Sequence, residues 1–264
     1  MRSSDKSFPS VAQAALLLLA SYLFQYLVSV LLYDCRSILG LGEEQVAVLA
    51  LVLSNGLLVA LLTQVLGISY RHLLHPSPSS PVLTLVLLVP PLLLTLPLLL
   101  RLDDVLISAL QQVLPLSNWE QQAFASMLAP TVPALVAGCL LAPLFEEMMF
   151  RGILLAGFLR RYPRGQAIAY SALFFGAAHL NLYQFFLAFL LGLMLGWLYE
   201  RSRSLLPCIA LHAAVNASAM ATSAQAEPNL ASGSWPLALA AGAAGALALY
   251  ALLGRKHRKE SIDP

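Results

Sequence analysis

The stretch Ala142-Pro143-Leu144-Phe145-Glu146-Glu147-Met148-Met149-Phe150-Arg151-Gly152 places three ionisable side chains inside an otherwise apolar part of this 264-residue chain. Residues 121–145 carry no charged side chain, and residues 152–159 carry none either. Because a charge at bilayer depth costs about 2.5–3.5 kcal/mol on insertion scales, such groups are seldom kept without a function. The simplest alternative is a structural ion pair that locks two helices together.

The composition is that of an integral membrane protein. The chain is 59% hydrophobic and only 11% charged, more apolar surface than a soluble domain of this size could bury. Its 13 acidic and 15 basic residues nearly balance, so net charge indicates no particular partner. Cys35, Cys139 and Cys208 are far apart and follow no C-x-x-C spacing, which argues against a disulfide framework or a thiolate zinc site.

Apolar runs predict an all-α membrane protein, a polytopic bundle of about eight transmembrane helices. Residues 165–199 carry no charge except a possible one on His179, and one helix of that length would extend about 52 Å, beyond a hydrocarbon core of about 30 Å. We therefore predict a break near Asn181. The predicted spans are 10–33, 45–68, 81–100, 131–159, 165–180, 182–200, 205–224 and 235–253.

The third span and the segment after it are irregular. Pro90, Pro91 and Pro97 predict that the helix over 81–100 is kinked or broken. Residues 101–129 then hold four charged side chains around an apolar stretch, 105–116. That stretch is interpreted as an interfacial helix or a partly re-entrant segment, and the sequence does not decide between them.

Charge placement predicts the orientation. With eight spans and the N-terminus inside, twelve basic residues are cytoplasmic, two are outside and one is in the membrane, which follows the positive-inside rule. We expect a multi-pass protein of the cell (cytoplasmic or inner) membrane with both termini cytoplasmic, the basic tail 255–259 being a stop-transfer anchor. The expected parts are N-terminal helices over 1–130, a core over 131–224, and a last helix and tail over 225–264.

Few other intramembrane groups can carry chemistry. His212 and Asn216 are four residues apart and so share one helix face. Glu147 and Arg151 have the same spacing, with the acid first, the better order for an intrahelical ion pair. Glu146 is rotated by about 100° from Glu147, so we expect it to face the bundle interior.

Depth along the chain suggests which groups can meet. Glu146 and His179 both lie about 21 Å along straight helices from the basic loop at 160–164, so they could meet across a hairpin. His212 is only about 13 Å from Arg203 by the same rise, which would place it nearer the cytoplasmic face unless its helix is tilted or starts late. The site is expected to open toward that side.

These groups suit hydrolysis. A desolvated glutamate near imidazoles can act as a general base on water, while a neutral histidine and an asparagine amide can donate to an oxyanion. The same groups could also ligate zinc through Glu146, His179 and His212. The sequence contains no H-E-x-x-H and no G-x-S-x-G motif and has no aspartate within a confident span, which argues against zincin, serine and aspartyl intramembrane proteases.

Three ordered motifs resemble those of the CAAX prenyl protease and bacteriocin-processing (CPBP, Abi) family of intramembrane proteases. Glu146-Glu147-Met148-Met149-Phe150-Arg151 resembles its E-E-x-x-x-R motif, residues 175–179 its F-x-x-x-H motif, and residues 212–216 its H-x-x-x-N/D motif. The resemblance covers roughly 131–219. It implies a multi-helix endopeptidase, often classed as a metalloprotease, that removes a C-terminal tripeptide from prenylated proteins in eukaryotes.

The resemblance also implies roles. Glu146 would activate water with help from His179, His212 and Asn216 would stabilise the oxyanion, and Glu147 and Arg151 would support them. We expect no cofactor, with one divalent metal such as zinc as the alternative. Expected partners are membrane lipid and a membrane-associated or lipidated protein or peptide substrate, and no nucleic acid.

Two other functions fit the same polar cluster. A non-catalytic membrane adaptor or bacteriocin-immunity protein would use it only for helix packing. A transporter with a midplane proton relay is a third possibility, but the sequence shows no inverted repeat.

Overall fold

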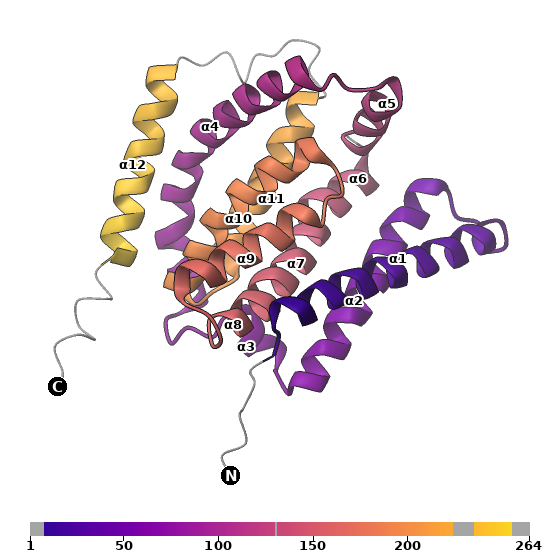
Figure 1. The fold of residues 1–264 in the computed structure, drawn as a ribbon, viewed down its shortest axis with the longest axis horizontal. Coiled ribbons are helices and arrows are strands. Elements are labelled where there is room, and N and C mark those ends of the chain that lie inside the picture. The colour runs from indigo at the N-terminus through magenta and orange to yellow at the C-terminus, as the bar shows by residue number, and fades with distance from the viewer. Residues whose placement is uncertain (1–7, 130, 224–234, 255–264) are drawn as a thin grey trace.

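A computed structural model describes residues 8–129, 131–223 and 235–254, which are helical throughout apart from short connections (Figure 1). The helices are α1 (Val11–Leu39), α2 (Glu43–Leu66), α3 (Tyr70–Leu74), α4 (Pro81–Val113), α5 (Asn118–Met127), α6 (Val132–Val136), η1 (Ala137–Leu141), α7 (Ala142–Glu147), η2 (Met148–Leu155), α8 (Ala156–Phe158), α9 (Arg164–Ala177), α10 (Leu182–Ser202), α11 (Leu206–Ser223) and α12 (Trp235–Leu253). Here η1 and η2 are π-helical.

The prediction of an all-α multi-pass membrane bundle is confirmed. A helix is found at each of the eight predicted positions, and among the described residues six helices are long and apolar enough to cross a membrane. Helix α9 has 14 residues, about 21 Å at 1.5 Å per residue, and α11 is also short. The number of eight membrane crossings therefore remains a prediction. The basic tail 255–259, predicted to be a stop-transfer anchor, lies outside the described residues.

Helix α4 differs from its prediction. It runs without interruption from Pro81 to Val113 although Pro90, Pro91 and Pro97 lie inside it. The predicted end of this span at residue 100 and the separate interfacial or re-entrant segment over 105–116 are therefore wrong. The prolines do not break the helix, and a kink, the other form of that prediction, stays a prediction. Neighbouring helix α12 packs closely along this region: a Cβ on Gly245 would lie 2.5 Å from the carbonyl oxygen of Pro91. Such packing can hold a proline-containing helix in one piece.

The predicted break near Asn181 is confirmed. Leu180 has a positive φ of 51°, and the Asn181 side chain accepts hydrogen bonds from the backbone N–H groups of Tyr183 and Gln184, which caps α10. Helices α9 and α10 pack at close range on either side of this turn. A Cβ on Gly192 would lie 3.0 Å from Cα of Ala172. His179 is thereby placed at the very end of the α9–α10 hairpin.

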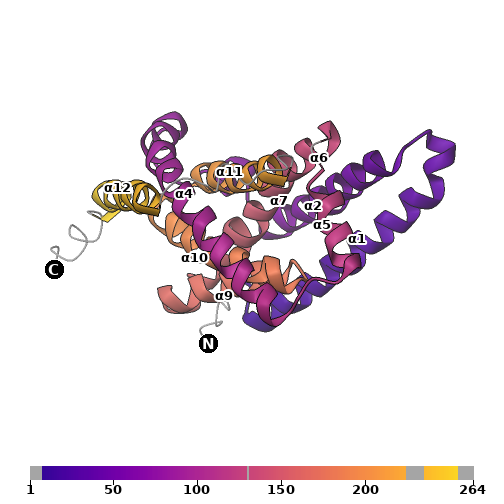
Figure 2. The ribbon, with the colours of Figure 1, turned by 90° about the horizontal axis from the view of Figure 1, so that it is seen from above.

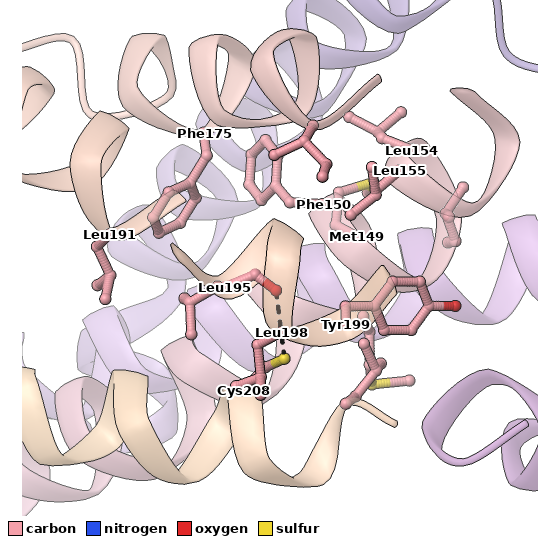
Figure 3. Packing of buried hydrophobic residues seen from close by; sticks show 14 of the residues in the cluster. Met149, Phe150, Leu154, Leu155, Phe175, Leu191, Leu195, Leu198, Tyr199 and Cys208 are labelled. Carbon is pink, nitrogen blue, oxygen red and sulfur yellow. Dashed lines mark hydrogen bonds between the residues drawn. The ribbon is translucent and has the colours of Figure 1, made fainter. Parts of the chain in front are cut away.

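The core lies between η2, α9, α10 and α11, as Figure 3 shows. Phe150, Phe175 and Leu195 are buried there, and the Sγ of Cys208 lies 3.6 Å from the carbonyl oxygen of Leu195. Cys208 is thus a small buried side chain of the core. The α1–α2 hairpin lies at one end of this core, and the α4–α12 pair lies at the other (Figure 2).

Candidate active site

The acidic cluster lies in a helix interrupted by two π-helical segments. Helix α7 ends at Glu147, η1 precedes it, and η2 comes after it with Arg151 in its first turn. A π turn inserts an extra residue and shifts the helical phase of the residues after it, and such turns are frequent at functional sites. Every residue of η2 is buried, so this phase shift fixes how the motif meets its neighbours.

Glu147 is the centre of a buried triad with Arg151 and His212. Its Oε1 lies 2.7 Å from Nη1 of Arg151 and 2.9 Å from Nδ1 of His212. The Glu147 and Arg151 side chains are fully buried, and that of His212 is 4% exposed. The carboxylate can only accept, so Nδ1 of His212 donates to it and the imidazole is fixed in orientation. The predicted Glu147–Arg151 ion pair is present, and its carboxylate also binds the imidazole of His212.

Phe175 connects the buried triad to His179. The guanidinium of Arg151 lies 4.2 Å from the centre of its ring, within cation–π range. The rings of His179 and His212 meet Phe175 edge-on at centroid distances of 5.3 and 5.4 Å. Phe175 is itself buried, so its ring sets the spacing between the two histidines.

Glu146 faces a cavity. Its side chain is 32% exposed and lines a space of about 200 Å³ together with His179, which confirms that Glu146 turns away from the ion pair. Nδ1 of His179 lies 2.9 Å from the carbonyl oxygen of Phe175, so Nδ1 donates and Nε2 is left as a potential proton acceptor. Oε2 of Glu146 has no hydrogen-bond partner among the described residues.

His212 lies behind Glu146 rather than in the cavity lining. Its Nε2 is 3.8 Å from Oε2 of Glu146. The estimate that placed His212 at a different depth from Glu146 is therefore wrong. Helix α11 packs against η1 and α7, and this contact brings His212 level with the acidic pair.

Asn216 shares the face of His212 as predicted, and its Nδ2 donates to the carbonyl oxygen of Gly138 at 2.8 Å. That carbonyl belongs to η1, so Asn216 ties α11 to the π-helical segment preceding the acids. One N–H of the amide remains, since the group has two.

Helices α1 and α2 contribute a part of the site that was not predicted from the sequence. Tyr22, Gln25 and Asn55 line the same cavity as Glu146. The hydroxyl of Tyr22 donates to the carbonyl oxygen of Ala178. In the sequence these residues stand out only as polar side chains within apolar spans. No local pattern relates them to Glu146, which lies more than 90 positions away.

The alternative zinc site is not assembled. Within residues 8–129, 131–223 and 235–254, no three histidine, cysteine, aspartate or glutamate side chains are grouped as metal ligands would be. The set Glu146, His179 and His212 therefore does not fit a zinc ion in this arrangement. Metal dependence of the reaction is a separate matter, which chelation tests directly.

Comparison with known proteins supports the motif assignment. Residues 128–218 match the family model described as type II CAAX prenyl endopeptidase Rce1-like. Comparisons with curated proteins and with solved structures gave no match. The matched segment holds all the predicted site residues, from Glu146 to Asn216, so the resemblance drawn from the three motifs is confirmed. Residues 128–218 are similar to the Rce1-like domain, and they lie within a chain that is a multi-pass membrane protein.

Proposed function

We propose that this chain is an intramembrane endopeptidase in which Glu146 activates a water molecule for attack on a peptide bond. The observation that carries the proposal is that two adjacent glutamates, Glu146 and Glu147, differ in burial and in hydrogen bonding. Glu147 is fully buried and its Oε1 is bonded to Arg151 and His212, whereas Glu146 is 32% exposed, lines the cavity and makes no hydrogen bond to the described residues. A carboxylate kept without a hydrogen bond at membrane depth is costly unless it has a use.

The proposed reaction uses the chain's own groups. Glu146, with Nε2 of His179 nearby in the cavity, takes a proton from water as the water oxygen bonds to the scissile carbonyl carbon. The carbon–nitrogen bond of the tetrahedral intermediate then breaks, and the proton passes to the departing amine. The products are one new carboxylate and one new amine, so the step needs no redox partner.

In this proposal His212 and Asn216 stabilise the oxyanion of the tetrahedral intermediate, and for His212 this depends on its protonation state. Because Nδ1 of His212 donates to Glu147, Nε2 can donate to an oxyanion only when the imidazole is protonated. The carboxylate of Glu147 would stabilise that imidazolium. Asn216 would contribute its remaining N–H, and otherwise it positions α11 through Gly138.

The finer assignments belong to the same proposal. The membrane is the cell membrane, with both termini in the cytoplasm, and the reaction proceeds without a bound metal. The family description favours a prenylated or otherwise lipidated protein as substrate. Helices α1 and α2 and the Rce1-like domain together enclose the reacting groups.

The test is a comparison of new peptide termini in membranes of cells that express the wild type, Glu146→Gln or His179→Ala at matched protein levels. We expect a set of termini to disappear in both variants. The control is Glu120→Gln, because Glu120 is a partly exposed glutamate that hydrogen-bonds Ser117 and does not line the cavity. Identical termini in all four samples would overturn the protease assignment and favour the adaptor function.

A further inference from the structure

The cavity that contains Glu146 has a second wall, built by helices that lie outside the Rce1-like domain. Residues 128–218 match the family model, whereas α1 and α2 precede it. We call this surface the hairpin wall, and its polar members are Ser21, Tyr22, Gln25 and Asn55. It faces Glu146 and His179 across a space of about 200 Å³.

The helical phase shows that α1 turns its polar face to the cavity. Positions 18, 21, 22 and 25 all line the cavity, and they follow the i, i+3, i+4, i+7 spacing of a single helix face. The other face is apolar and open: Leu19, Leu23 and Leu27 are 65%, 60% and 55% exposed. A helix surrounded only by lipid would gain nothing from this polarity.

The hairpin wall is held in place relative to the catalytic groups. The Tyr22 hydroxyl donates to the carbonyl oxygen of Ala178, the residue before His179. On α2, a Cβ at Gly56 would lie 3.6 Å from Cζ of Phe145, the residue before Glu146. Each helix of the hairpin is thus fixed beside one of the two groups proposed to activate water.

Two carboxamides on this wall have hydrogen-bonding capacity that the chain does not use. Among the described residues, Gln25 makes no hydrogen bond, and Asn55 makes one, from Nδ2 to the carbonyl oxygen of Leu51 at 3.1 Å. The amide oxygen of Asn55 has no donor there. Since unsatisfied polar groups at membrane depth are costly, their placement opposite Glu146 calls for an external partner.

The chemistry of a carboxamide identifies that partner. It offers two N–H donors and a carbonyl acceptor, the same groups that an extended peptide presents along its backbone. A lipid chain would offer neither donors nor acceptors, and it would be matched by leucine at these positions. The occupant that fits the hairpin wall is therefore a peptide main chain.

We infer that Gln25 and Asn55 bind the backbone of the peptide substrate across the cavity from Glu146, which makes the α1–α2 hairpin a substrate-selecting wall. The inference rests on the proposed function, because it assumes that a peptide enters this cavity. It assigns substrate binding to helices outside the segment that carries the family motifs. Gln25 and Asn55 hold the substrate and take no part in moving the proton.

The experiment separates binding from cleavage. The probe is a fluorescent farnesylated peptide ending in Cys-aliphatic-aliphatic-X, and its Kd is measured on the full-length Glu146→Gln protein in detergent micelles. The same measurement is made after adding Gln25→Leu, Asn55→Leu or both. Gln64→Leu is the matched control, since Gln64 is an exposed glutamine of α2 that does not line the cavity.

We expect each substitution on the hairpin wall to raise Kd by about 3- to 10-fold, the effect of one lost hydrogen bond, and the control to leave it unchanged. A series of probes then replaces one backbone amide at a time by an ester, which removes a single N–H. At the contacted position the ester should weaken binding to the parent protein by a similar factor. It should have no further effect on the Gln25→Leu/Asn55→Leu protein.

Equal Kd values for the parent and the double variant would overturn the inference, as would an ester effect that persists in the double variant. Failure of the probe to bind the Glu146→Gln protein would overturn it too. Binding that matches the expected pattern, without cleavage by the Glu146-containing wild type, would instead contradict the proposed function and leave the binding assignment standing.

Discussion

Arg151→Leu is the substitution whose cost can be worked out most directly from the structure. The guanidinium is fully buried, pairs with Glu147 at 2.7 Å and covers the ring of Phe175 at 4.2 Å. Its removal leaves a buried carboxylate with only His212 as a partner. Breaking such a pair costs about 3–5 kcal/mol, and the lost cation–π contact is included in that total.

The double variant Arg151→Leu/Glu147→Leu should recover most of this loss. With both charges gone no uncompensated carboxylate remains, and replacing a buried pair by apolar groups is often nearly neutral. His212 loses its acceptor, which costs about 1–3 kcal/mol. We therefore expect the double variant to be about 1–3 kcal/mol less stable than the wild type, and more stable than Arg151→Leu.

The assay is equilibrium unfolding in mixed micelles, combined with cleavage of the farnesylated peptide. The double variant should regain stability without regaining activity, because Glu147 no longer orients His212. A single variant as stable as the wild type, or a double variant no better than the single, would refute the buried-triad reasoning. Activity in the double variant would show that orienting His212 is unnecessary.

Three further substitutions or treatments test separate parts of the structure and mechanism. Gly152→Ala should lower the free energy of unfolding by about 1–3 kcal/mol, because the new Cβ would lie 2.6 Å from Cδ1 of Leu73. Gly165→Ala is the control: its Cβ would meet nothing within 4 Å, so it should be neutral or slightly stabilising in the same unfolding assay. Asn216→Leu should cost about 1–3 kcal/mol by leaving the Gly138 carbonyl unpaired and should also reduce cleavage, and an unchanged melting temperature would contradict the contact. Treatment with a metal chelator should leave the cleavage rate unchanged, and a loss of activity that zinc restores would contradict the metal-free proposal.

The sequence was informative where local rules govern the structure. Composition and apolar run lengths predicted the helices, and excess length predicted the break at Asn181, where a side-chain cap and a positive φ at Leu180 stop one helix and start the next. The i, i+4 spacing predicted the Glu147–Arg151 pair because the two residues lie on one helix face. In each case the deciding interactions are within a few residues of one another.

Prediction failed where distant segments decide the outcome. The prolines of α4 suggested a break, but continuous packing on α12 accompanies an uninterrupted helix. His212 was placed too shallow because distance along a straight helix ignores how α11 packs on α7. The hairpin wall was missed for the same reason, since nothing local relates Gln25 or Asn55 to Glu146.

The central claim is that Glu146 activates water, and the most direct measurement is the cleavage rate of the farnesylated peptide by purified protein in proteoliposomes. The wild type and Glu146→Gln are compared after measurement of their melting temperatures has shown that both proteins are folded and similarly stable. We expect a wild-type rate that falls by about 10²–10⁴-fold in Glu146→Gln, the contribution of a general base. A folded Glu146→Gln protein that cleaves at a rate close to wild type would contradict the claim.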